Sequence, residues 1–157
     1  MYSFLYTFCR DRQEAEDLLH DTFLKAHRAL LGGERLLEPR HWLLRVAYRT
    51  ATDHWRRARL VRWLPIEGLR REPAVPSDST STDEREAIVA VLRRLPPDQR
   101  ACLVLREGED MPYAAIAATL GLSLGAVKMK LLRARERFRR LYTALADERD
   151  GGEERAP

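Results

Sequence analysis

The sequence predicts an all-α protein of two small helical domains joined by a flexible linker, the second domain holding a winged-helix-like helix-turn-helix. Three observations predict this class. Apolar residues recur at helical spacing in both halves of the 157-residue chain, with no strand-like alternation. Proline, serine and threonine crowd the segment PIEGLRREPAVPSDSTST (65–82), which can bury little. A glycine turn separates two helical patterns between Met111 and Arg140. We expect domains at 1–63 and 84–145, a linker at 64–83 and a disordered tail at 146–157.

The first domain is expected to contain three helices. The first presents Phe4, Leu5 and Phe8 on one face. The second is expected to begin at Asp11, an N-cap with Glu14 as its capping-box partner, and to end at two glycines. Its apolar stripe comprises Ala15, Leu18, Leu19, Thr22, Phe23 and Ala26. The third follows Pro39 and is expected to bury Trp42, Leu43, Val46, Ala47, Thr50 and Ala51.

The second domain is expected to contain four helices. Asp83 is a candidate cap for the first, which Pro96 and Pro97 end, and Gln99 begins the next. In the helix-turn-helix, Pro112 should open the first helix, Gly121 should adopt the positive φ of the turn, and Ser123 should cap the second helix. Its small core is expected to comprise Ile116, Ala117, Leu120, Leu122, Val127 and Leu131.

The helix after Gly121 is strongly basic, which favours a nucleic-acid partner. It carries Lys128, Lys130, Arg133, Arg135, Arg137, Arg139 and Arg140 against one acid, Glu136. The side chains expected to face a DNA major groove are Leu124, Gly125, Lys128, Met129, Leu132 and Arg133. The later arginines are suited to backbone phosphate, which gives affinity without sequence preference. The alternative is a basic surface helix in a protein-binding bundle.

Charge in the first domain is divided into two blocks. Residues 11–21 contain five acids against one base, and residues 40–62 contain seven arginines against Asp53. Aromatic residues are interleaved with those arginines, namely Trp42, Tyr48, Trp55 and Trp63, a combination suited to unstacked bases of single-stranded DNA. The acidic block suggests a second, basic partner. The alternatives are that the charges solvate helix faces and that Trp42 is a core residue.

Other classes of function are disfavoured. Cys9 and Cys102 stand alone without C-x-x-C spacing, which fits a reducing cytoplasm. No apolar run approaches the length of a membrane span, and the N-terminus lacks the features of a signal peptide. The four histidines show no metal-ligand spacing, and no phosphate loop or nucleophile motif is present. We therefore expect neither an enzyme nor a cofactor-binding protein.

These segments, in this order, resemble the bacterial RNA polymerase sigma factors of the extracytoplasmic-function (ECF) type. AEDLLHDTFLKAHRAL (15–30) and HWLLRVAYRTATDHWRR (41–57) are similar to stretches of the family's region 2. Residues 92–140 are similar to its region 4, with LRRLPPDQR at the start and GAVKMKLLRARERFRR at the end. The resemblance extends from about Phe4 to Leu141. It implies a cytoplasmic factor that binds core polymerase and directs transcription initiation at promoters.

The resemblance also implies roles for individual residues. Region 2 would grip the clamp of the polymerase β′ subunit through Asp17, Leu18, Asp21, Thr22 and Phe23. It would recognise and help to melt the −10 element through the loop 32–40 and through Arg45, Arg49, Asp53, Arg56 and Arg57. Region 4 would contact the flap of the β subunit and read the −35 element through Lys128, Met129, Lys130, Leu132 and Arg133. An anti-sigma factor is a further partner that the resemblance suggests.

Four positions depart from the family's usual residues. His20 replaces a glutamine and Arg49 an asparagine, and Met129–Lys130 replaces a serine–arginine pair. The promoter sequence therefore cannot be borrowed from the family. Two other classes of function remain open at this point. One is a dimeric helix-turn-helix regulator that acts without polymerase, and the other is a protein-interaction module that has lost its promoter role.

Overall fold

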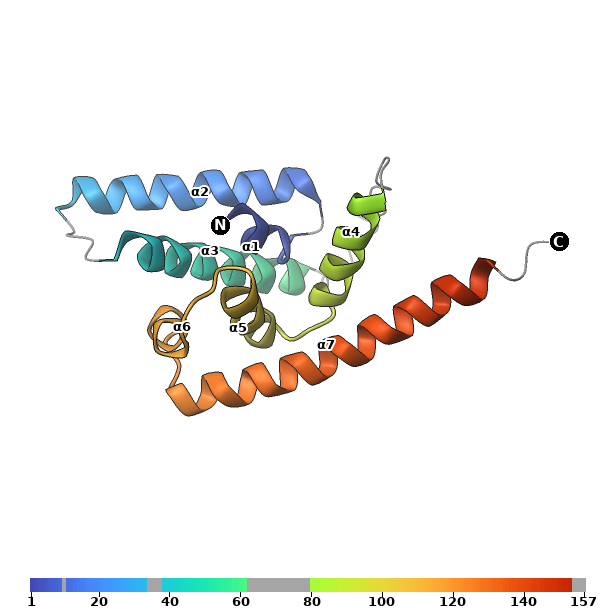
Figure 1. The fold of residues 1–157 in the computed structure, drawn as a ribbon. Helices are drawn as coiled ribbons and strands as arrows, with labels where there is room; N and C mark the ends of the chain where they lie inside the picture. The colour runs from blue at the N-terminus through green and yellow to red at the C-terminus, as the bar shows by residue number, and fades with distance from the viewer. Residues whose placement is uncertain (10, 34–37, 62–79, 154–157) are drawn as a thin grey trace.

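The fold was analysed in a computed structural model that describes residues 1–9, 11–33, 38–61 and 80–153. The first half contains α1 (Tyr2–Tyr6), α2 (Arg12–Leu31) and α3 (Pro39–Val61). The long helices α2 and α3 run antiparallel, and α1 lies beside them (Figure 1). Most of the expected linker and Trp63 lie outside the described residues.

The second half contains α4 (Thr80–Arg93), α5 (Pro97–Glu107), α6 (Tyr113–Leu120) and α7 (Leu124–Glu153). Helix α7 runs beneath α5 and α4 and extends past them towards the C-terminus (Figure 1). The all-α class is confirmed. No strand forms in the described ranges, so the helix-turn-helix has no β-wing there.

The local signals for helix ends are confirmed. The Asp11 side chain accepts a hydrogen bond from the Glu14 backbone N–H at 2.9 Å, which caps α2. Gly121 adopts φ 68°, where a residue with a Cβ is strained. The Ser123 Oγ accepts from the Ala126 N–H at 3.1 Å and caps α7. The helix-turn-helix therefore forms from interactions within a few residues of its turn.

Three helix ends differ from expectation. Helix α5 begins at Pro97, two residues before Gln99. Helix α4 begins at Thr80, so Asp83 lies inside the first turn and is not the residue before the helix. Helix α7 continues to Glu153, so residues 146–153 are helical where we expected disorder. Alanine and leucine near Leu145 are strong helix formers, which allows a well-started helix to continue.

The two halves pack against each other around one connected core. Helix α3 contacts α6, and α1 contacts α5. The core joins Phe4, Leu44 and Ala47 from the first half to Leu105 and Ile116 from the second. No single described helix is long and apolar enough to cross a membrane. The pair α6 and α7, bent by 102° at its turn, passes that test only when the two helices are taken together, and it belongs to this core.

Candidate nucleic-acid and protein interfaces

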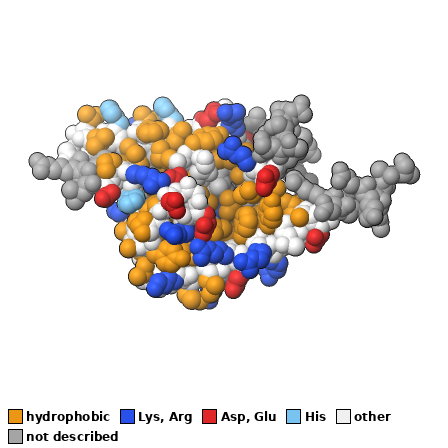
Figure 2. Space-filling view, viewed as in Figure 1, with side chains coloured by type: hydrophobic (Ala, Val, Ile, Leu, Met, Phe, Trp, Pro, Cys, Tyr) orange, Lys and Arg blue, Asp and Glu red, His pale blue; other side chains and the backbone are white. Residues whose placement is uncertain are grey.

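The outer face of α7 presents basic and apolar side chains to solvent. Its exposed members, which we call the recognition surface, are Leu124, Lys128, Met129, Leu132 and Arg133. Leu124, Met129 and Leu132 keep 46%, 48% and 51% of their surface exposed, which is high for large apolar residues. Figure 2 shows Lys and Arg side chains along the edge formed by α7, with apolar side chains among them. This combination suits guanine edges, phosphates and thymine methyl groups.

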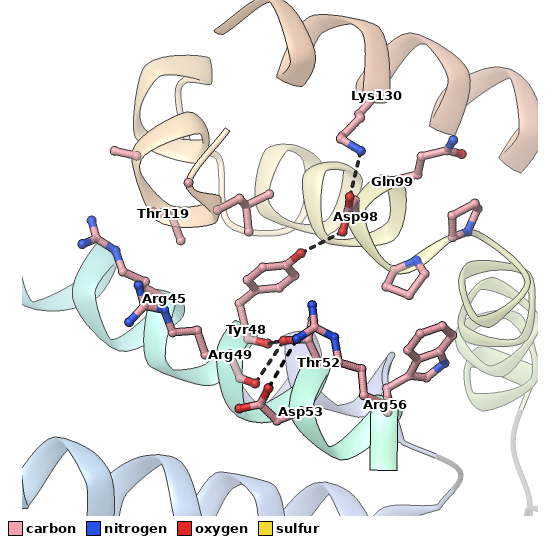
Figure 3. Close-up of a pocket in the computed structure, with 16 residues that line it drawn as sticks. Arg45, Tyr48, Arg49, Thr52, Asp53, Arg56, Asp98, Gln99, Thr119 and Lys130 are labelled. Carbon is pink, nitrogen blue, oxygen red and sulfur yellow. Dashed lines mark hydrogen bonds and ion pairs between the residues drawn. The ribbon is translucent and has the colours of Figure 1, made fainter. Parts of the chain in front are cut away.

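Lys130 lies on a different face of α7 from the recognition surface. Its Nζ donates to Asp98 Oδ2 at 2.8 Å, and its side chain is 29% exposed. The other carboxylate oxygen, Asp98 Oδ1, accepts from the Tyr48 hydroxyl of α3 at 2.9 Å (Figure 3). The hydrogen bond from Lys130 lowers the pKa of Asp98, burial opposes this shift, and the bond from Tyr48 adds to it. Lys130 is therefore held by protein partners, whereas we expected it to face the −35 element.

The arginines of α3 lie along a groove between the two halves. The groove has a volume of about 780 Å³, and α3 contributes Arg45, Arg49, Asp53 and Arg56 to its lining. The opposite wall contains Pro97, Asp98, Thr119 and Gly121. Arg56 and Asp53 are 3.9 Å apart at their closest charged atoms and form an ion pair within the helix. Arg57 is exposed but lies outside the groove lining.

The described aromatic residues among these arginines, Trp42, Tyr48 and Trp55, are at least half-buried. The Tyr48 hydroxyl bonds Asp98, and its ring packs edge-on against Phe8 with centroids 6.5 Å apart. Trp42 and Trp55 are half-buried, and Trp55 lines the groove. Of these, Trp55 is best placed to meet an unstacked base.

Helix α2 has an exposed acidic and apolar face. Asp17 and Asp21 are exposed, and Phe23 keeps 50% of its surface exposed. Leu18 and Thr22 are 4% and 0% exposed, so they face the core and cannot contact a partner as we expected. Helical geometry explains the correction, because positions 18, 22 and 26 share one face whereas position 23 lies about 100° from position 22.

Side-chain hydrogen bonds and ion pairs also join the two halves, and we call the four contacts described next the clasp. Arg40 Nη2 donates to Glu109 Oε2 at 2.7 Å and to the Glu109 carbonyl at 2.8 Å. Arg100 Nη1 donates to the Thr7 carbonyl at 2.7 Å, and Arg93 Nη2 donates to the Tyr6 carbonyl at 3.2 Å. The fourth contact is that of Tyr48 with Asp98.

Arg100 is 4% exposed, and its charge is balanced by carbonyl oxygens. Besides Thr7, its Nη2 donates to the carbonyls of Arg93 and Leu95 at 2.8 and 3.0 Å, and its guanidinium lies 4.9 Å from the Phe8 ring centroid. Burial, followed by the nearby Arg93, lowers the pKa of Arg100 to about 10. The role of Arg100 was not predicted from the sequence. Its position directly before the apolar run Ala101–Leu103 could have indicated that Arg100 is buried.

Glu109 is another charged group of the clasp. Burial acts to raise its pKa, but hydrogen bonds from the Met1 amino group and from Arg40 outweigh burial and lower it. Glu109 therefore remains an anion that holds the start of α3 beside the loop before α6.

Among the described residues, the remaining reactive side chains offer no catalytic arrangement. Cys9 and Cys102 are free and buried, and burial raises the pKa of Cys9 to about 12 and that of Cys102 to about 11. Such thiols are poor nucleophiles. Within the described ranges, no group of three or more His, Cys, Asp or Glu residues could hold a metal ion.

Two family models match the chain in the order of its two halves. The model described as sigma-70 region 2 matches residues 1–61, and that described as sigma-70 region 4 matches residues 85–138. The first match covers α1 to α3, and the second covers nearly all of α4 to the middle of α7.

Several curated proteins with similar sequences are named RNA polymerase sigma factors. The RNA polymerase sigma-H factor of Pseudomonas aeruginosa is 33% identical over 143 residues, covering 82% of this chain and 73% of the relative. The RNA polymerase sigma-E factor of Streptomyces coelicolor is 35% identical over 131 residues, covering 82% and 72%. The ECF RNA polymerase sigma factor SigJ of Mycobacterium tuberculosis is 33% identical, but only 41% of its length is covered.

Two solved structures have a similar fold. One is the sigma factor RpoE of Bartonella quintana in complex with the anti-sigma factor NepR, with a TM-score of 0.66, 25% identity, and coverage of 90% of this chain and 89% of that one. The other is CnrH in complex with the cytosolic domain of CnrY, with a TM-score of 0.65, 25% identity, and coverage of 91% and 80%. The similarity in both cases spans both halves of the chain.

Proposed function

The chain belongs to the RNA polymerase sigma factors of the ECF type, which bind core polymerase and direct promoter-specific initiation, and we propose that three of its surfaces share this task. It is a transcription initiation factor and not an enzyme. The surfaces are the exposed face of α2, the groove face of α3 and the recognition surface of α7. The two halves act as region 2 and region 4, with the boundaries expected at 63 and 84.

The recognition surface of α7 reads the −35 element. Lys128 and Arg133 are exposed and reach base edges or phosphates, while Met129 and Leu132 supply apolar contacts. Lys130 takes no direct part while it remains bonded to Asp98. Arg137, Arg139 and Arg140, exposed further along the helix, add contacts with phosphate.

Helix α3 binds the −10 element. Arg45, Arg49, Asp53, Arg56 and Arg57 provide positive charge and one hydrogen-bond acceptor along a single helix, and Trp55 provides a half-buried ring beside them. A cationic path with an adjacent aromatic ring holds single-stranded DNA through phosphate contacts and stacking. The loop before α3 lies partly outside the described residues.

Helix α2 binds core polymerase. Asp17 and Asp21 offer negative charge, and Phe23 offers an exposed apolar anchor beside them. Leu18 and Thr22 hold this helix against the core and act only by positioning the exposed residues. Exposed aromatic anchors rimmed by charge are typical of protein interfaces.

The cytoplasm is the proposed location, because that is where core polymerase and promoters meet. An anti-sigma factor is a further proposed partner, since the similar structure from Bartonella quintana is a complex of a sigma factor with an anti-sigma factor. Region 4 is also proposed to contact the flap of the polymerase β subunit.

This proposal rests on the occurrence of two surfaces on one chain. They are the exposed acidic and apolar face of α2 and the recognition surface of α7. A regulator that acts without polymerase needs only the second surface, and this alternative is not favoured. Run-off transcription with purified core polymerase on pooled genomic fragments tests the proposal. We expect discrete transcripts that core polymerase alone does not make. Binding to duplex DNA without any transcript would contradict it.

A further inference from the structure

The recognition surface of α7 is apolar at its centre and basic at its two edges. At about 100° per residue, the exposed Met129 and Leu132 lie about 60° apart around the helix, on the side opposite Val127, which is 0% exposed. Lys128 and Arg133 flank this pair, each about 40° further round the helix. A helix that enters a major groove with this face turns the apolar pair to the base edges and the cations to the phosphates on either side.

Gly125 lies between Met129 and Leu132 on this face, one turn nearer the start of α7. A Cβ at this position would meet nothing within 4 Å, and the backbone is not in the left-handed region, so the fold does not require a glycine here. Glycine is also less favourable than alanine within a helix. A missing side chain on an exposed face lets the helix backbone approach a ligand closely.

The centre of this face is matched by one kind of group on DNA. Base edges in the major groove carry hydrogen-bond donors and acceptors, and the thymine 5-methyl is their apolar group. A donor or acceptor covered by Met129 or Leu132 would lose its bond to water without gaining another, which lowers affinity. Lys130 does not supply that bond, because it donates to Asp98 at 2.8 Å on the inner side of α7. Glu136 lies on the same face, but one turn beyond Leu132.

We propose that the recognition surface selects its −35 element through the methyl groups of two thymines, one packed against Met129 and the other against Leu132. Lys128 and Arg133 bind phosphates on the two sides of the groove and supply affinity. Side chains three positions apart on a helix are about 5–6 Å apart at Cβ, so the two thymines are one or two base pairs apart at about 3.4 Å per pair. This inference deepens the proposed assignment of α7 to the −35 element and rests on it.

The test removes single methyl groups from DNA. The full chain, with and without core polymerase, is used to enrich tightly bound duplexes from a random-sequence pool. Each thymine of the enriched sequence is then replaced in turn by deoxyuridine, which lacks the 5-methyl group and keeps every hydrogen bond of thymine. We expect two positions at which the replacement weakens binding about fourfold, the size of effect expected for one buried methyl group. Fluorescence anisotropy measures the affinities.

Alanine variants then identify the side chains that contact the methyl groups. Met129→Ala and Leu132→Ala should each abolish the deoxyuridine effect at one position and keep it at the other. The matched control is Leu30→Ala on α2, which should keep both effects, because Leu30 is 52% exposed and Leu132 is 51% exposed. Lys128→Ala and Arg133→Ala should weaken binding and reduce its salt slope by about one, without changing either deoxyuridine effect. Circular dichroism verifies equal helix content.

Gly125→Ala provides an independent measurement with opposite effects on folding and binding. The Tm should stay the same or rise, because alanine favours a helix and the added methyl group has room in the free protein. Binding to the enriched duplex should nevertheless weaken about tenfold, because the methyl group would overpack a close contact with DNA. Equal affinity of this variant and the wild type would overturn the close approach.

The remaining outcomes separate this inference from the assignment on which it rests. Unchanged affinity after every deoxyuridine replacement would overturn the thymine readout. Deoxyuridine effects that persist in both apolar variants would overturn its assignment to Met129 and Leu132. If no duplex is enriched, or if the enriched duplexes bind Lys128→Ala and Arg133→Ala as tightly as the wild type, the assignment of α7 to the −35 element fails.

Discussion

Region 4 has an outer face, exposed to solvent, and an inner face, packed against region 2. Both faces carry basic side chains, but only those of the outer face are free of contacts with region 2. Lys128 and Lys130 are two positions apart on α7, which places them about 200° apart around the helix. Lys128 is exposed, whereas Lys130 is bonded to Asp98 and through it to Tyr48 of region 2. Positive charge on a helix is therefore not sufficient to identify a DNA contact. The neighbours of each cation decide whether it is available.

The largest expected difference between the two faces is in stability, and it is measured at Arg100 on the inner face and Arg133 on the outer face. Arg100→Ala should lower the free energy of unfolding by about 3 kcal/mol, because buried carbonyls of Thr7, Arg93 and Leu95 lose their donor. Arg133→Ala, on the exposed face, should change it by less than about 0.5 kcal/mol. Urea unfolding followed by circular dichroism measures both. Equal effects of the two substitutions would mean that Arg100 does not fasten the halves.

The next, smaller difference is in affinity for duplex DNA, and it is measured at Lys128 on the outer face and Lys130 on the inner face. Lys128→Ala should weaken binding to a −35 duplex about tenfold and reduce the slope of affinity against salt by about one. Lys130→Gln should leave both quantities nearly unchanged, because this side chain is already occupied by Asp98. Fluorescence anisotropy at several salt concentrations measures them. A loss as large for Lys130→Gln would show that Lys130 leaves Asp98 for DNA, and the inner face would then not be a separate surface.

The features that the sequence predicted correctly depend on neighbours close in the chain. The Asp11 cap, the positive φ of Gly121 and the Ser123 cap each involve residues no more than four positions away. The same holds for the small core around Ile116, Val127 and Leu131, whose spacing is set by helical geometry. Local chemistry was therefore sufficient for the helix-turn-helix.

The features that the sequence did not predict depend on contacts between distant residues. Lys130 pairs with a residue 32 positions away, and Arg100 with a carbonyl 93 positions away. The roles of Leu18 and Thr22 came from a resemblance, which assigns a helix to a partner but not the direction of each side chain. Only the packing of α2 on α3 showed that these two residues are buried and that Phe23 is exposed.

The division of labour between α2 and α7 is tested most directly by two affinities measured on the same pair of variants. Lys128→Ala/Arg133→Ala should weaken binding to a −35 duplex about a hundredfold and leave the affinity for core polymerase unchanged. Asp17→Arg should do the reverse, since it changes only the exposed acidic face of α2. If either variant lost both affinities equally while remaining folded, the assignment of separate surfaces to promoter and polymerase would be wrong.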